Sequence, residues 1–244
     1  MTNIDDLRIF LGGDYVINAA ITIRQPTLKE IIEYGEQNYN ALLSILTAYP
    51  SDMKSALWDA GVDYTKITSF QLFCQFASSL NLDQTRILFG DLDFTKLVMR
   101  KNNGFDALCD IRQGVVIDEA VYLLIQNFLC RSNLIKKKQE TPGNENTKMM
   151  LIEWDRDDRR AAMRKPHRSN LLPYMSAMVN YQGFKYDYQT VQNLTMYQFM
   201  DAVNRTSMFV SAQSLLQGLY SNPYLDSSKI DKTQLNWLRE ASDN

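Results

Sequence analysis

The sequence has little histidine, cysteine, glycine or proline, and each shortage excludes a class of protein. The single histidine, His167, would need other ligand types to complete a metal site; its basic run, RKPHRSN, favours a solvated turn. The three cysteines are odd in number, widely spaced and set among apolar residues, which predicts reduced thiols in a cytosolic protein. Ten glycines and six prolines are too few for a collagenous or low-complexity chain.

Long apolar runs and the standard catalytic motifs are also missing. A mean hydropathy of -0.31 disfavours a transmembrane protein, and the acidic opening MTNIDDLRIF is not a secretory signal. The chain has no glycine-rich dinucleotide motif, P-loop, His-Glu-x-x-His, Cys-x-x-Cys or Gly-x-Ser-x-Gly. We therefore expect no catalytic residue, no metal, no cofactor and no enzyme. The alternative is a Mg²⁺-dependent hydrolase or transferase using Asp91 and Asp93.

Apolar periodicity predicts an α+β protein, mainly α-helical, with a small antiparallel β-sheet in its N-terminal half. Leu7–Leu11 and Val16–Ile23 predict a hairpin around two glycines. Thr27 and Glu30 predict a capping box that opens a helix reaching Asn38 or beyond. Further predictions, in chain order, are a cap at Thr68 or Ser69, a cap at Asp118, strands over Thr95–Met99 and Val115–Ile117, and helices over Met149–Arg164, Leu171–Tyr181 and Thr195–Tyr220.

A change in character near residue 132 predicts two domains. Residues 133–148 contain three consecutive lysines and then a Pro-Gly pair, without apolar periodicity. We expect an N-terminal α+β domain over 1–132, a flexible basic linker over 133–148, and a C-terminal helical domain over 149–244.

A basic band runs from Arg131 to Arg168, with eleven Lys and Arg against six acids, in a chain whose net charge is only -2. Such asymmetry is typical of a charged hinge between two packed halves, or of a surface for nucleic acid or an acidic protein. Nucleic-acid binding is the less favoured interpretation, because neither a nucleic-acid-recognition motif nor interleaved aromatic residues accompany the band. The residues singled out in the band are Lys136, Lys137, Lys138, Arg159, Arg160 and Arg164.

The C-terminal helices are rich in methionine, which adapts to irregular apolar partners and fills cores equally well. Met196, Phe199, Met200 and Val203 share one helical face. We expect Phe199 in the core and the far end of the helix at an interface. The residues predicted to bind a partner are Leu215, Leu216, Leu219, Met196 and Met200.

Several segments resemble small proteins encoded in the tail modules of phages and prophages of Gram-positive bacteria. These segments are IRQPTLKEIIEYGE (23–36), LWDAGVDY (57–64), FQLF (70–73), and GF (183–184) followed by NLTMYQF (193–199). The resemblance implies a tail assembly chaperone, or another tail or baseplate component, that binds a tape-measure or neighbouring structural protein and catalyses nothing.

The expected function is therefore that of a tail assembly chaperone in the bacterial host cytoplasm, whose helices shield apolar segments of a phage tail or tape-measure protein. The alternatives left open are a virion component of the baseplate, neck or head–tail connector, and a nucleic-acid-binding protein. Self-association is open as well, and no membrane partner is expected.

Overall fold

The computed structural model describes residues 6–102, 104–166, 168–221 and 231–239. It confirms an α+β fold that is mainly helical, with small antiparallel sheets. The helices are α1 (Asp6–Phe10), α2 (Leu28–Tyr34), α3 (Glu36–Leu46), α4 (Lys54–Asp59), α5 (Ser69–Ala77), α6 (Leu82–Phe89), α7 (Glu119–Ser132), α8 (Glu145–Met163), α9 (Leu171–Val179) and α10 (Met196–Ser221). Short 3-10 helices lie at η1 (Pro50–Met53), η2 (Phe94–Lys96), η3 (Val191–Asn193) and η5 (Lys232–Leu235). The strands are β1 (Tyr15–Asn18), β2 (Ile21–Ile23), β3 (Val98–Asn102), β4 (Phe105–Asp110) and β5 (Val115–Asp118).

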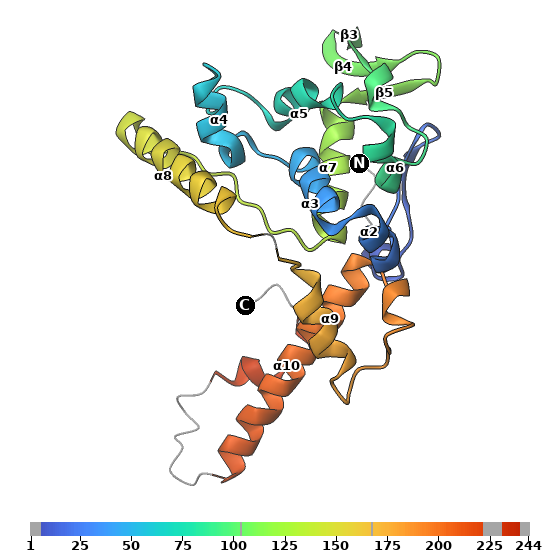
Figure 1. Cartoon of the computed structure of the whole chain (residues 1–244), viewed down its shortest axis with the longest axis vertical. Helices are drawn as coiled ribbons and strands as arrows, with labels where there is room; N and C mark the ends of the chain where they lie inside the picture. Colours follow the sequence, from blue (N-terminus) through green and yellow to red (C-terminus); the bar gives the residue numbers. More distant parts are fainter. Residues whose placement is uncertain (1–5, 103, 167, 222–230, 240–244) are drawn as a thin grey trace.

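The chain forms a body with two projections (Figure 1). The body holds the sheets together with α2, α3 and α5 to α7. Helices α4 and α8 lie side by side on one flank of the body, and α9 and α10 extend below it. The sheets are the hairpin β1–β2 and the antiparallel sheet β3–β4–β5.

The predicted N-terminal hairpin is wrong in its first strand. Residues 6–10 form helix α1, and the observed hairpin joins β1 to β2 through Asn18, whose side chain accepts hydrogen bonds from the amides of Ala20 and Ile21. An apolar run as short as Leu7–Leu11 suits either a strand or a helix. Gly12, at φ +77, ends the helical turn because a left-handed residue stops propagation.

The long helix predicted from residue 28 is divided in two. The capping box of Thr27 and Glu30 is present as predicted, but α2 ends at Gly35, whose φ of +97 a side chain would strain. Helix α3 then starts at Glu36 in a new direction. The predicted caps at Thr68 and Asp118 are confirmed because each side chain accepts a hydrogen bond from the amide three residues on.

The other predicted elements are present with shifted ends. The strand predicted over Thr95–Met99 starts at Val98, since Phe94–Lys96 forms η2 under a cap by Asp93. Helix α8 begins four residues before the predicted Met149, at Glu145, because Asn144 caps it. Helix α9 ends at Val179, and α10 spans Met196–Ser221.

The main core is aromatic and is shared by most elements of the body. Tyr122 stacks on Phe73 with ring centroids 4.7 Å apart, and Tyr15 stacks on Phe128 at 5.0 Å. The C-terminal part contributes Phe199, which is fully buried, so its predicted place in the core is confirmed. A smaller second core lies between α4, α5 and α8 and contains Leu57, Leu72 and Ile152.

Candidate protein-binding surfaces

The five residues predicted to bind a partner occupy two places on α10. Met196 and Met200 lie in its first two turns and line a cleft of about 420 Å³ between α3, α9 and α10, together with Leu171 and Tyr174. The three leucines lie in its last two turns. The structure therefore does not bring the five side chains together on one surface.

Helix α9 is held at this cleft by a carboxylate from α3. The Glu36 side chain accepts hydrogen bonds from the Ser169 hydroxyl at 2.5 Å and from the amides of Asn170 and Leu171 at 2.8 and 3.1 Å. Asn170 itself makes no side-chain cap. Glu36 thus satisfies the free amides at the start of α9 and places a negative charge at the positive end of its dipole.

The start of α10 is fixed against the start of α2. Thr195 and Gln198 form a capping box, and Thr195 pairs with Thr27 in an antiparallel β-bridge. The Leu28 amide donates to the Leu194 carbonyl at 2.8 Å. Two segments that carry the tail-module resemblance, 23–36 and 193–199, therefore touch each other, although more than 150 residues separate them in the chain.

The second half of α10, residues 209–221, lies outside both cores. Among the described residues, neither core contains an α10 side chain beyond Val203. Phe209 makes an edge-to-face contact with Trp237, and the Arg205 guanidinium donates to the carbonyls of Trp237 and Arg239. Leu215 and Leu219 are half-buried, whereas Leu216 is exposed. This half of α10 projects from the body as an arm (Figure 1). Leu216 and Tyr220 are apolar side chains exposed on it.

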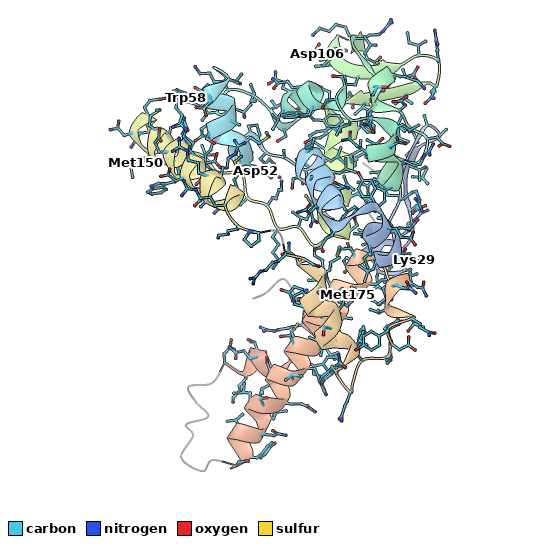
Figure 2. All side chains as sticks on the ribbon, viewed as in Figure 1. Lys29, Asp52, Trp58, Asp106, Met150 and Met175 are labelled. Carbon is cyan, nitrogen blue, oxygen red and sulfur yellow. The ribbon has the colours of Figure 1, made fainter. Side chains whose placement is uncertain are left out.

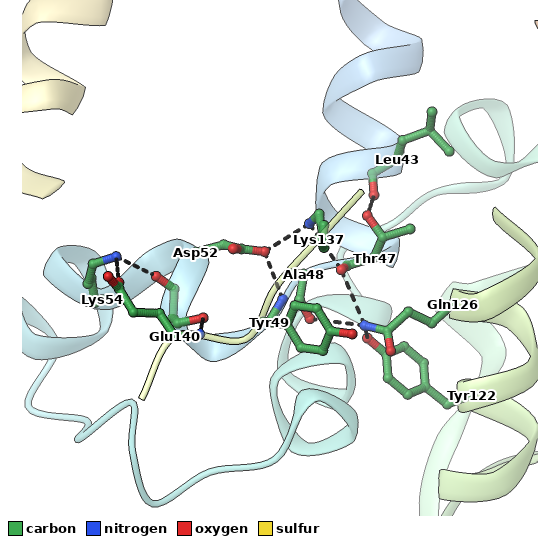
Figure 3. A network of polar contacts seen from close by, with 11 residues as sticks. Leu43, Thr47, Ala48, Tyr49, Asp52, Lys54, Tyr122, Gln126, Lys137 and Glu140 are labelled. Atoms are coloured by element: carbon green, nitrogen blue, oxygen red, sulfur yellow. Dashed lines mark hydrogen bonds and ion pairs between the residues drawn. The ribbon is translucent and has the colours of Figure 1, made fainter. Parts of the chain in front are cut away.

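The predicted basic linker is tied to the body over its first half. The Lys137 ammonium donates to the Asp52 carboxylate at 2.8 Å and to the Thr47 carbonyl, at the end of α3, at 3.0 Å (Figure 3). Lys54 reaches Glu140 at 2.7 Å. A cation at the last carbonyls of a helix is favoured by the helix dipole. The flexibility of 133–148, and the domain division built on it, stay predictions.

A buried amide reinforces the same corner. The Gln126 side chain donates to the carbonyls of Thr47 and Ala48 at 3.2 and 3.4 Å, and lies 3.2 Å from the Tyr122 hydroxyl (Figure 3). Burial raises the pKa of Tyr122 well above its usual value. The hydrogen bonds of Gln126 with Thr47, Ala48 and Tyr122 therefore form a structural network rather than a titrating site.

Other members of the basic band face acids of the body or of their own helix. Arg156 contacts Asp59 on α4 at 2.5 Å and Glu153 at the same distance. Arg159 donates to the Ser55 hydroxyl at 3.3 Å, and Arg160 lies 3.5 Å from Asp157. The side chains of Lys136, Lys138 and Arg164 are exposed.

Lys148 is the most enclosed cation of the band. Its ammonium lies 3.2 Å from the Asp63 carboxylate and 2.7 Å from Glu145, and it sits 5.5 Å from the Trp58 ring centroid (Figure 2 labels Trp58). The Thr65 hydroxyl and amide, together with Lys148, lower the pKa of Asp63 to about 2. Charge pairing and Ile152 in the second core thus join α8 to α4.

The residues considered for metal chemistry have structural partners. Asp93 accepts hydrogen bonds from the Thr95 hydroxyl and amide, which lower its pKa, while Asp91 lies 3.5 Å from Arg86. Within the described ranges, no group of three His, Cys, Asp or Glu side chains could hold a metal ion. The cysteines are free thiols, and His167 lies outside the described residues.

Sequence reasoning missed a groove between α5, the start of α7 and the β3–β4 hairpin, described below. Its side chains come from segments that are not adjacent in sequence. Phe105, an aromatic that directly follows the Asn-Gly turn, was the one local signal. Over the described ranges, no helix combines the length and apolar character that a membrane crossing requires.

The fold and these surfaces define a mainly helical α+β protein whose outward features are apolar clefts and charged helix faces. Residues 164–241 match a family model described as the YomV second domain, a phage-derived family of a Bacillus prophage. The match begins at Arg164, the C-cap of α8, and covers α9 and α10. Searches of curated proteins and of solved structures returned no significant match.

Proposed function

We propose that the chain is a non-enzymatic phage protein that binds another phage protein during virion assembly. Its specific form is a tail assembly chaperone that binds a tape-measure or neighbouring tail protein in the host cytoplasm. The observation that carries this proposal is the projecting half of α10, which holds Leu215, Leu216 and Leu219 outside both cores, within the segment similar to a phage-derived domain.

The proposed chaperone acts by binding its partner and requires no catalytic step. An apolar helix face on a projecting arm can cover an apolar helix of a partner, because helix-in-groove contacts repeat at three- and four-residue spacing. Leu215, Leu216 and Leu219 follow that spacing over the last turns of α10. The partner leaves when its own assembly contacts bury the same apolar surface.

The ion pairs of the basic band support this reading over nucleic-acid binding. Lys137, Lys148 and Arg156 are engaged with acids, so fewer cations remain for phosphates. We expect no complex with DNA or RNA tighter than about micromolar at physiological salt, the range of non-specific binding.

The first test is mass spectrometry of particles purified from the phage or prophage that encodes the chain. The second is co-purification of partners with the tagged chain from host cells harvested before the phage lyses them. A chaperone should be absent from the particles and should bring down a tail or tape-measure protein from the cells. The Leu219→Asp variant should lose that partner. Stoichiometric amounts in particles would instead identify a virion component and reject the chaperone.

A further inference from the structure

An open groove of about 890 Å³ lies on the body, and no residue of α10 lines it. The residues that line it come from α5 and the residue before it, from the first turns of α7 and the residue before them, and from β3 and β4. The groove shares no lining residue with the cleft that holds Met196 and Met200.

Large apolar side chains are exposed along this groove. Phe105, Leu123 and Met99 are 75%, 49% and 46% exposed, and Phe70 lies beneath them almost completely buried. Met99 pairs in register with Leu108, which is in the main core. Met99 therefore lies on the same face of the sheet as Leu108 but is exposed to solvent, and exposed apolar patches mark interaction sites.

The charged residues that line the groove are all acidic. Asp106, Asp118 and Glu119 line it, whereas the lining residues include no Lys or Arg. Asp118 accepts the Val121 amide at the start of α7, and Asp106 meets Lys101 in a surface pair at 2.8 Å (Figure 2 labels Asp106). Such exposed pairs contribute little and exchange readily. Within the described chain, no cation lies within ion-pair distance of the Glu119 carboxylate.

The neutral part of the wall supplies hydrogen bonds. Helix α5 contributes Thr68, Gln71 and Gln75, of which Thr68 and Gln71 satisfy each other in the capping box of the helix. The Gln75 amide can both donate and accept. A peptide backbone, which carries one donor and one acceptor per residue, matches such a wall.

We propose that this groove binds a short segment of a partner protein in which apolar side chains are flanked by lysine or arginine. Apolar side chains would cover Phe105, Leu123 and Met99, and the cations would meet Glu119 and Asp106. The exposure of Phe105 at the rim favours a chain segment over a small molecule, because small ligands are usually buried over most of their surface. The proposal is independent of the α10 arm and of the chaperone role.

The test measures binding of two fluorescein-labelled synthetic peptides to the full chain by fluorescence polarisation. One peptide alternates leucine with lysine, and its match replaces every lysine by glutamate. The basic peptide should bind and the acidic one should not. Glu119→Lys and Phe105→Ala should each raise the Kd of the basic peptide at least about tenfold, since one removes a charge partner and the other an apolar contact. Both side chains are exposed, so both variants should fold.

Two controls make the result specific to the groove. Glu33→Lys changes an exposed acid on α2 by the same charge and should alter Kd less than about twofold. Cys74 lines the groove and Cys130 does not, although both are half-buried. The basic peptide should slow alkylation of Cys74 by N-ethylmaleimide and leave Cys130 unchanged, as read by mass spectrometry of each site.

Three outcomes would overturn the proposal. The first is equal binding of both peptides, and the second is an unprotected Cys74. The third is self-association of the chain in sedimentation velocity that Phe105→Ala abolishes, because the occupant would then be a second copy. Loss of the α10 partner in Leu219→Asp with unchanged peptide binding would separate this site from the proposed chaperone surface.

Discussion

The two halves of α10, residues 196–208 and 209–221, belong to one regular helix, yet their surroundings differ. The first half begins at a capping box docked on α2 and inserts Phe199, fully buried, into the main core. The second half carries Leu216 and Tyr220 with 37% and 88% of their surface exposed and packs against η5. Apolar residues at helical spacing therefore identify a helix face without telling whether the same chain or a partner covers it.

The comparison assigns different roles to the two halves. A side chain buried in a close-packed core contributes to the stability of the fold, since removing it leaves a cavity. A side chain exposed on a projecting helix contributes to the binding of a partner instead.

Phe199→Ala should destabilise the folded chain by about 3–5 kcal/mol, the usual cost of deleting a fully buried aromatic. That loss is a large fraction of a stability of roughly 5–15 kcal/mol. Urea unfolding followed by circular dichroism measures it. Phe209→Ala is the matched control in the second half of α10, where Phe209 is only half-buried, and it should cost clearly less. Equal costs would show that the second half is core as well.

What the sequence could predict in this fold was local. The capping box at Thr27 and the caps at Thr68 and Asp118 depend on a side chain and an amide three residues apart, so the pattern contains the whole interaction. Phe199 was placed correctly because it continues a four-residue apolar stripe.

What the sequence could not predict was set by distant partners. Helix α1 is held by α10, whose Gln198 side chain donates to the Phe10 carbonyl at 3.0 Å, and by an ion pair between Asp6 and Arg131. Lys137, Lys148 and Arg156 each also pair with an acid that lies 85 or more residues away in the chain, so the sequence could not show that the basic band is tied to the body. The groove beside Phe105 likewise exists only once α5, α7 and the hairpin meet.

Glu36→Ala should loosen α9 from α3 by removing the acceptor that caps the start of α9. Three donors at the start of α9 lose their acceptor, and the loss of a helix cap costs about 1–2 kcal/mol. Trypsin cleavage after Arg164 and Arg168 should become faster than in the wild type. Glu33→Ala, an exposed acid on α2, is the control and should leave the cleavage rate unchanged. Unchanged cleavage in Glu36→Ala would mean that α9 is held by its apolar contacts alone.

Leu219→Asp should leave the fold intact, in contrast to Phe199→Ala. A polar substitution at a half-exposed position away from both cores should change the free energy of unfolding by less than about 1 kcal/mol. Circular dichroism and the melting temperature should remain close to those of the wild type, while co-purification of the phage partner is lost. An unfolded Leu219→Asp chain would place this end of α10 in a core.

The join between α8 and α4 should depend on pH. The folded pKa of Asp63, about 2, lies below its ordinary value of 3.8, chiefly because the Thr65 hydroxyl donates to it, with Lys148 adding to the shift. A depressed carboxyl pKa stabilises the fold above the unfolded value, and this contribution disappears as the pH falls through the folded value. Asp63→Asn should therefore melt a few degrees below the wild type at neutral pH, with a gap that closes between about pH 4 and pH 2. Thr65→Val should raise the Asp63 titration midpoint in carboxyl ¹³C NMR, because it removes the strongest donor while Lys148 stays in place. If the gap in melting temperature persisted below pH 2, Asp63 would hold α8 by packing rather than by charge.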